Sequence, residues 1–224
     1  MKLPTNRLFM WILVGVMLFN FASPVLADQP DEVQTDVSNS EAEVDDEQDN
    51  QTRGSYFEVG VLTIVARQGH AFLVLENTST MDYDIGPYTV DPGETITIGT
   101  FPKLDPLRPR SGIYFNLEAY GVYEEPYVYY GRYSMSTGLE YADILSIDAY
   151  ISTPSNNTWM EGRECYVFAV SVWNLVADYT LPPDGTLLMV LIDNDYSVRN
   201  CYLPARPKSD AYYIDSYGCL VSVP

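Results

Sequence analysis

The sequence contains one histidine, His70, and only three cysteines, Cys165, Cys201 and Cys219. An ordinary zinc site takes four Cys or His ligands with closely spaced pairs, so this set excludes one. The chain also lacks a glycine-rich phosphate loop and the Gly-Xaa-Ser-Xaa-Gly motif of serine hydrolases. We therefore expect no metal, no cofactor and no serine nucleophile.

Positive charge is scarce as well. The chain has 12 Lys and Arg against 31 Asp and Glu, which gives a formal net charge of −19. A protein that binds nucleic acid neutralises a row of phosphates with basic side chains, and this chain has few to offer. The same balance argues against docking on anionic lipid or an anionic wall polymer.

The first 27 residues have the pattern of an export signal. Lys2 and Arg7 precede an apolar run over residues 8–22, and Val25-Leu26-Ala27 places small residues where a signal peptidase reads them. The run is shorter than a typical membrane span. We predict a signal peptide over residues 1–27, a mature chain from about Asp28, and a secreted or cell-surface location without membrane attachment. The alternative is an uncleaved membrane anchor.

An acidic linker is predicted to follow over residues 28–53. Residues 28–50 contain ten acidic side chains and neither a basic nor an aromatic one. Such a segment cannot bury enough surface to offset the entropy of ordering it. Residues 54–224 are long enough for one globular domain with a core of its own.

The first half of this domain has the pattern of strands. Residues 59–75 predict one long or two short strands, with a turn at Arg67-Gln68-Gly69. Residues 88–90 and 95–98 flank Asp91-Pro92-Gly93-Glu94 and predict a hairpin. Further strands are expected over residues 112–120 and 127–135.

Helices are predicted in the second half. Thr137 and Glu140 match a capping box, and the helix that follows should end before Pro154. A second, amphipathic helix begins at Cys165, a short apolar segment covers residues 186–192, and the tail is expected to be irregular. Strands first and helices later indicate the α+β class, an antiparallel sheet with helices.

Three cysteines in an exported chain leave one unpaired. Cys201 and Cys219 lie in one C-terminal segment, and a disulfide between them would stabilise the fold by roughly 3 kcal/mol. Cys165 then remains as a free thiol at a helix start. Two alternatives stay open: all three thiols are reduced and Cys165 is a small buried apolar residue, or Cys165 itself forms a disulfide.

The free thiol and the single imidazole form a candidate catalytic pair. A cysteine at a helix N-terminus that faces a histidine on a strand is how a cysteine nucleophile is assembled. Cys165 would attack an acyl carbon, His70 would carry the proton, and the Cys165 amide would stabilise the oxyanion. Asn116 is the first candidate to orient His70 and Glu118 the second, because both should lie on one face of the predicted strand. Glu76 shares the strand parity of His70 but points from the same strand end and is less suitable.

The order of these parts also matches a family. Gly69-His70-Ala71-Phe72-Leu73 on an early strand and Cys165-Tyr166-Val167-Phe168-Ala169 at a later helix start resemble the circularly permuted papain-like hydrolases. These are the relatives of NlpC/P60 and lecithin-retinol acyltransferase in which histidine precedes cysteine. Residues 112–120 and 168–174 are similar to exported Gram-positive proteins of that group. The resemblance covers roughly residues 61–174 and implies a permuted papain-like fold.

The resemblance implies a cysteine hydrolase or acyltransferase that acts on an amide, peptide or ester bond. Cell-wall peptides are the first substrate to consider, and acyl transfer is equally compatible with the pair. One departure is Glu164, where members commonly have asparagine. A carboxylate beside the thiol disfavours the thiolate, although Arg163 can compensate. The alternative is therefore a non-catalytic exported domain that binds peptide, glycan or a surface protein through some of its 19 tyrosines.

Overall fold

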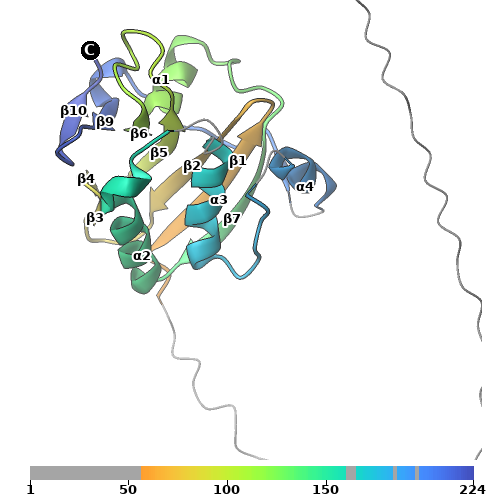
Figure 1. Ribbon diagram of the computed structural model, residues 1–224. Helices are drawn as coiled ribbons and strands as arrows, with labels where there is room; N and C mark the ends of the chain where they lie inside the picture. Colours follow the sequence, from red (N-terminus) through yellow and green to blue (C-terminus); the bar gives the residue numbers. More distant parts are fainter. Residues whose placement is uncertain (1–56, 160–164, 184–185, 195–196) are drawn as a thin grey trace, which may run out of the picture. The chain divides into compact units, whose positions relative to one another are not determined.

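An eight-stranded sheet forms the centre of the computed structural model, which describes residues 57–159, 165–183, 186–194 and 197–224 (Figure 1). Its strand order is β10-β9-β6-β5-β2-β1-β7-β8, and every pairing is antiparallel. The strands are β1 (Gly60–Arg67), β2 (His70–Asn77), β5 (Thr95–Phe101), β6 (Gly112–Phe115), β7 (Tyr133–Leu139), β8 (Val198–Arg199), β9 (Tyr212–Ile214) and β10 (Leu220–Ser222).

The remaining elements are one small sheet and several helices. β3 (Tyr83–Ile85) and β4 (Tyr88–Val90) pair with each other, and the helices are α1 (Leu117–Glu124), α2 (Tyr141–Ser152), α3 (Cys165–Val176) and α4 (Leu187–Asp193), with 3₁₀ turns at Pro154–Asn156 and Lys208–Asp210. The predicted combination of an antiparallel sheet with helices is confirmed. The predicted signal peptide and acidic linker lie outside the described residues.

The two faces of the sheet carry different packing. Leu73 and Leu75 of β2 belong to the main core, which α2 and α3 cover on one face (Figure 1). Phe72 and Val74 alternate with them and pack on the other face against Tyr129. This alternation is the period-two pattern of a strand buried on both sides. His70 has the parity of Phe72 and is the first residue of β2, so its side chain lies at the end of the central hairpin.

The hairpin of β1 and β2 confirms two strands over residues 59–75. Arg67 pairs with His70 across the turn, and Gly69 adopts a φ of +81° there. The predicted hairpin of residues 88–90 with 95–98 is wrong, although the Asp91–Glu94 turn forms. β4 turns back on β3 instead, through Gly86 with a φ of +60°, while β5 pairs with β2. Glycine adopts a positive φ without steric cost, so Gly86 allows the short turn that joins β3 to β4.

Two strand boundaries differ from the predictions. The strand expected over 112–120 ends at Phe115, because Asn116 takes a left-handed φ of 58° and starts α1. The strand expected over 127–135 starts only at Tyr133, after Gly131 with a φ of +75°.

Thr137 does not cap a helix, because β7 continues to Leu139 in register with Gly60. Glu140 is the N-cap of α2 in its place, and Asp143 completes the capping box by accepting a hydrogen bond from the Glu140 backbone N–H at 2.8 Å. The C-terminal tail, expected to be irregular, adds three short strands to the sheet.

The predicted Cys201–Cys219 disulfide is absent, and all three cysteines are free thiols. Cys201 follows β8 at one end of the strand order and packs against the cluster around Tyr129, whereas Cys219 precedes β10 at the other end and is exposed. Bridged cysteines have Cα atoms within about 7 Å, and the strands between these positions prevent that approach. In the part of the chain that the structure describes, no helix is long and apolar enough to cross a membrane.

Candidate active site

The single imidazole is hydrogen-bonded to a buried carboxylate. His70 Nε2 lies 3.1 Å from Glu118 Oε1, and the Glu118 side chain is completely buried while that of His70 is 13% exposed. Glu118 belongs to the first turn of α1, which follows the left-handed residue Asn116. A buried carboxylate in this position fixes the orientation of the ring and stabilises its protonated form.

The sheet holds the Glu118 carboxylate in place. Thr97 Oγ1 of β5 donates a hydrogen bond to Glu118 Oε2 at 3.0 Å. Gly99, two residues further on the same face, leaves room for the carboxylate, since a Cβ at this position would lie 1.9 Å from Glu118 Oε1. Both carboxylate oxygens are therefore engaged, one by the strand and one by His70.

Cys165 lies at the beginning of α3, packed against the start of β2. Its side chain is 7% exposed, and its Sγ accepts a hydrogen bond from the Ala71 backbone N–H at 3.4 Å. An N–H that points at sulfur stabilises negative charge on it. The next residue, Tyr166, accepts a hydrogen bond from the Gly69 N–H and donates one to the Arg67 carbonyl, so α3 is fastened to the β1–β2 turn.

His70 interacts with both the thiol and the carboxylate. Burial alone lowers the pKa of the imidazole, but hydrogen bonding to the Cys165 and Glu118 side chains outweighs this and raises the pKa from 6.5 to about 9. A proton is therefore held on His70 at neutral pH, which is the state that pairs with a thiolate and can protonate a leaving group.

A cavity of about 590 Å³ opens onto the pair. Both His70 and Cys165 line it, together with Arg67, Gly69, Thr100, Phe101, Pro102, Arg108, Tyr129 and Trp159. The Phe101 ring centroid lies 4.8 Å from that of His70, and that of Tyr129 lies 6.5 Å away. These rings exclude water from one side of the imidazole, which strengthens its interactions with charged neighbours.

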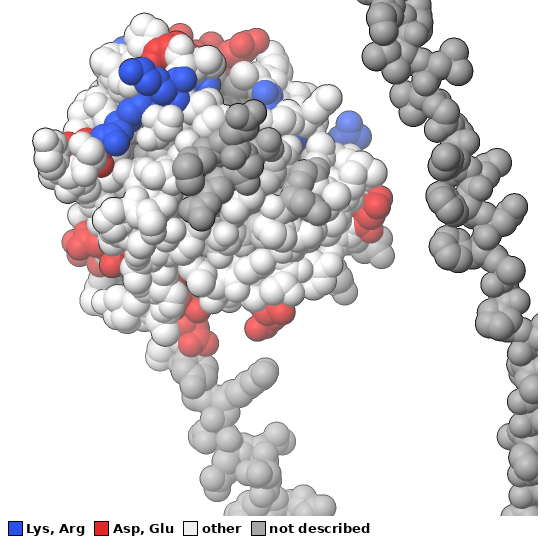
Figure 2. Space-filling view, viewed as in Figure 1, with Lys and Arg blue, Asp and Glu red and all other residues white. Residues whose placement is uncertain are grey.

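Two arginines form the basic wall of this cavity. The Arg67 guanidinium lies 5.1 Å from the Tyr129 ring centroid and donates to the Val128 carbonyl, and Arg108 is paired with Asp105. On the face shown in Figure 2, basic side chains gather near the end of the sheet where α1 and the β5–β6 loop lie. The cavity is thus more basic than the strongly acidic chain as a whole.

Asn116, the first candidate to orient the imidazole, does not contact it. Its Oδ1 accepts a hydrogen bond from the Thr97 backbone N–H, and its Nδ2 donates to Tyr88 Oη and to the Asp210 carbonyl. Asn116 therefore joins three segments of the fold, and Glu118, the second candidate, holds the ring. The two side chains diverge because the strand ends at Phe115, before both of them, and the left-handed Asn116 starts a helix there.

The other residues singled out in the sequence either lie away from Cys165 and His70 or fall outside the described residues. Glu76 is exposed at the opposite end of β2 and lines a different cavity. Glu164 and Arg163 lie outside the described residues. Sequence reasoning missed Thr97, Gly99 and Tyr166, because their roles depend on strand register and on the docking of α3. Only Gly99 offered a signal, because a glycine within an otherwise apolar and β-branched strand indicates that another group packs closely against the backbone there.

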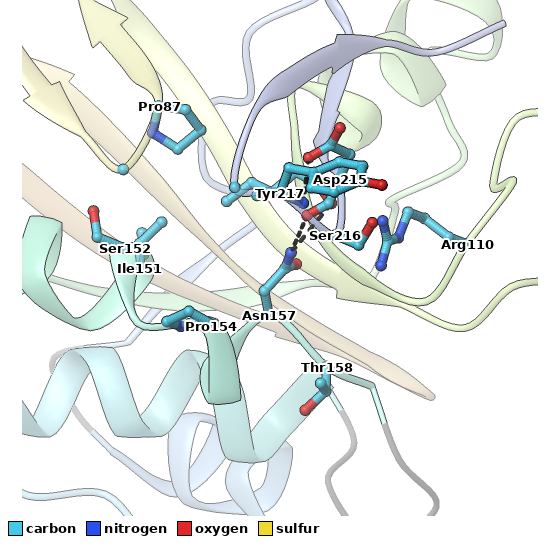
Figure 3. Close-up of a pocket in the computed structure, with 13 residues that line it drawn as sticks. Pro87, Arg110, Ile151, Ser152, Pro154, Asn157, Thr158, Asp215, Ser216 and Tyr217 are labelled. Carbon is cyan, nitrogen blue, oxygen red and sulfur yellow. Dashed lines mark hydrogen bonds between the residues drawn. The ribbon is translucent and has the colours of Figure 1, made fainter.

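A second cavity, of about 510 Å³, lies apart from this chemistry. The β3–β4 turn, the end of α2 and the β9–β10 turn enclose it, and Figure 3 shows Arg110 and Tyr217 beside it. Asn157 Nδ2 donates to the carbonyls of Ile214 and Asp215 at 3.1 and 3.3 Å. Neither Cys165 nor His70 lines this cavity.

Among the described residues, no group of three or more His, Cys, Asp or Glu side chains is placed to hold a metal ion. Comparison with protein-family models, with curated proteins and with solved structures gives no match for this chain.

Proposed function

We propose that the protein is a cysteine hydrolase or acyltransferase that acts on an amide, peptide or ester bond. The observation that carries the proposal is the placement of the three side chains: His70 is hydrogen-bonded to the buried Glu118, it lines one cavity with Cys165, and the Cys165 thiol accepts a hydrogen bond from the backbone of the residue after His70. A histidine that served only as a core residue would need neither the buried Glu118 nor a place on the cavity wall beside Cys165.

The chemistry divides among three side chains. The Cys165 thiolate attacks the acyl carbon, an S–C bond forms, and the carbonyl electron pair moves onto oxygen. As the tetrahedral species collapses, the bond to the leaving group breaks, and His70 gives its proton to the departing nitrogen or oxygen. Water or another acceptor then attacks the thioester, His70 takes up its proton, and the thiolate is restored. Glu118 stabilises the protonated ring throughout.

The order of the elements supports a circularly permuted papain-like arrangement as the fold proposal. His70 stands at the start of a strand and precedes Cys165, which stands at the start of α3 and is packed against that strand. On this proposal the enzyme is exported and cell-wall peptides are its substrates. The basic wall formed by Arg67 and Arg108 suits a substrate that carries a carboxylate.

Hydrolysis of p-nitrophenyl acetate tests the proposed reaction without knowledge of the natural substrate. The wild-type protein should release a burst of p-nitrophenol equivalent to the protein present, and Cys165→Ser and His70→Gln should abolish it. Cys219→Ser is the matched control, because Cys219 is an exposed thiol that does not line the cavity of the pair. A wild-type rate no faster than that of Cys165→Ser would refute the proposal and favour a binding domain.

A further inference from the structure

Thr100 is a buried polar residue whose hydroxyl has no partner among the described residues. The residue is 2% exposed, and its Oγ1 makes no hydrogen bond within the described part of the chain. Leaving a buried hydroxyl unpaired costs stability, so such a group in a native fold calls for an explanation. Thr100 lines the same cavity as Cys165 and His70.

The register of β2 and β5 indicates where Thr100 lies relative to the thiol. The pairing ends with Leu73 opposite Ile98, and continuing it by two residues brings Thr100 opposite Ala71. The Ala71 N–H is the donor to Cys165 Sγ. Ile96 and Ile98 have the parity of Thr100 and share a core cluster with Cys165, so the hydroxyl lies on the face of the sheet that carries the thiol.

The other unpartnered buried atoms do not combine these features. Tyr83 Oη lies near Gly60, at the opposite end of β1 from the β1–β2 turn, and Arg110 Nε belongs to the second cavity. Arg67 Nε lines the same cavity as Cys165, but its guanidinium is already held by the Val128 carbonyl. Among the residues that the structure describes, Thr100 alone combines an unpartnered buried hydroxyl with a place on the cavity of Cys165.

We propose that the Thr100 hydroxyl donates a hydrogen bond to the carbonyl oxygen of the acyl group that Cys165 attacks. The inference rests on the proposed function, and it assigns Thr100 as an oxyanion-stabilising catalytic residue. As the S–C bond forms, the carbonyl oxygen gains negative charge, and a donor held in a cavity stabilises this charge without reorganising. In the free protein the same hydroxyl remains unpaired, so stability is lost at this position in exchange for catalysis.

Thr100→Val tests the assignment, because valine keeps the shape and removes only the hydroxyl. Two reactions of Cys165 are compared. Acylation by p-nitrophenyl acetate passes through an oxyanion, whereas alkylation by iodoacetamide displaces iodide and forms none. We expect Thr100→Val to slow acylation by about 100-fold, to leave the alkylation rate unchanged, and to leave the melting temperature unchanged or raised. Thr100→Ser, which keeps a hydroxyl, should retain most of the acylation rate.

Three results would overturn the assignment. If Thr100→Val acylates as fast as wild type, the hydroxyl does not stabilise the oxyanion although the proposed reaction stands. An equal loss in both reactions would mean that Thr100 only positions Cys165. Absence of Cys165 acylation in the wild-type protein would refute the proposed function, and the role of Thr100 with it.

Discussion

Replacing Glu118 by glutamine removes the negative charge beside His70 and changes little else. The carboxylate is fully buried and 3.1 Å from His70 Nε2, and glutamine can keep a hydrogen bond to Thr97 Oγ1. The pKa of His70 should therefore fall, because burial, which disfavours the charged ring, is then opposed by the Cys165 side chain alone.

The size of the fall follows from the contact. An opposite charge within about 4–6 Å shifts a pKa by about one to three pH units. Glu118 and Cys165 together raise the pKa of His70 from 6.5 to about 9. Because only the contribution of Glu118 is lost in the variant, we expect its His70 to titrate one to two pH units lower, at about 7 to 8. This corresponds to roughly 1–3 kcal/mol of lost stabilisation of the protonated ring.

The sole histidine makes the assay direct. Its ring Cε1–H resonance in a proton NMR spectrum needs no assignment by further variants, because the chain has no other imidazole. Glu76→Gln is the matched control, since Glu76 is an exposed carboxylate at the far end of the same strand. A wild-type midpoint near 6.5, or equal midpoints in wild type and Glu118→Gln, would refute the reasoning.

The same contacts predict stability. Because the folded-state pKa of His70 is raised to about 9, its stabilisation is complete below about pH 6.5 and is lost as the pH rises through 9, by roughly 3 kcal/mol; urea unfolding should show this loss in wild type and not in His70→Gln. Gly99→Ala should lower both the melting temperature and the His70 midpoint, since the new Cβ would meet Glu118 Oε1; an unchanged midpoint would contradict the contact. Asn116→Ala should reduce the free energy of unfolding by about 2–4 kcal/mol and leave the midpoint unchanged, with Asn116→Gly about 1 kcal/mol less harmful because of the positive φ. If Asn116→Ala and Asn116→Gly lose the same free energy of unfolding in urea, the backbone at this residue is not strained.

Chemistry and periodicity were enough to predict the pair and much of the central sheet. His70 is the only imidazole, and Cys165 begins an amphipathic helix, so their residue types alone made them candidates. The apolar residues on both sides of Gly69 predicted one long or two short strands, and the structure has two, β1 and β2. The turn at Gly69 is local, and His70 and Cys165 were each identified from their own surroundings rather than from the contact between their segments.

The features that depend on tertiary pairing were missed. Asn116 and Glu118 share a face only in a continuous strand, and the left-handed backbone at Asn116 breaks that strand. Asparagine tolerates this conformation better than most residues, which was the available signal. Thr137 does not cap a helix as predicted, because it belongs to β7 and pairs with β1. Cys201 and Cys219 are close in sequence, but the strand order places them at opposite edges of the sheet. Long-range pairing outweighs each local preference.

Alkylation of the three cysteines in one sample of reduced protein tests the central claim, that His70 activates Cys165. Iodoacetamide is added at about pH 6.5, well below the ordinary thiol pKa of about 8.5, and the rate at each cysteine is followed by peptide mass spectrometry. Cys165 should react faster than the exposed Cys219 although only 7% of its side chain is exposed, and His70→Gln should remove that advantage. If the rates follow exposure instead, with Cys219 ahead of Cys165, the thiol is not activated and the account is wrong.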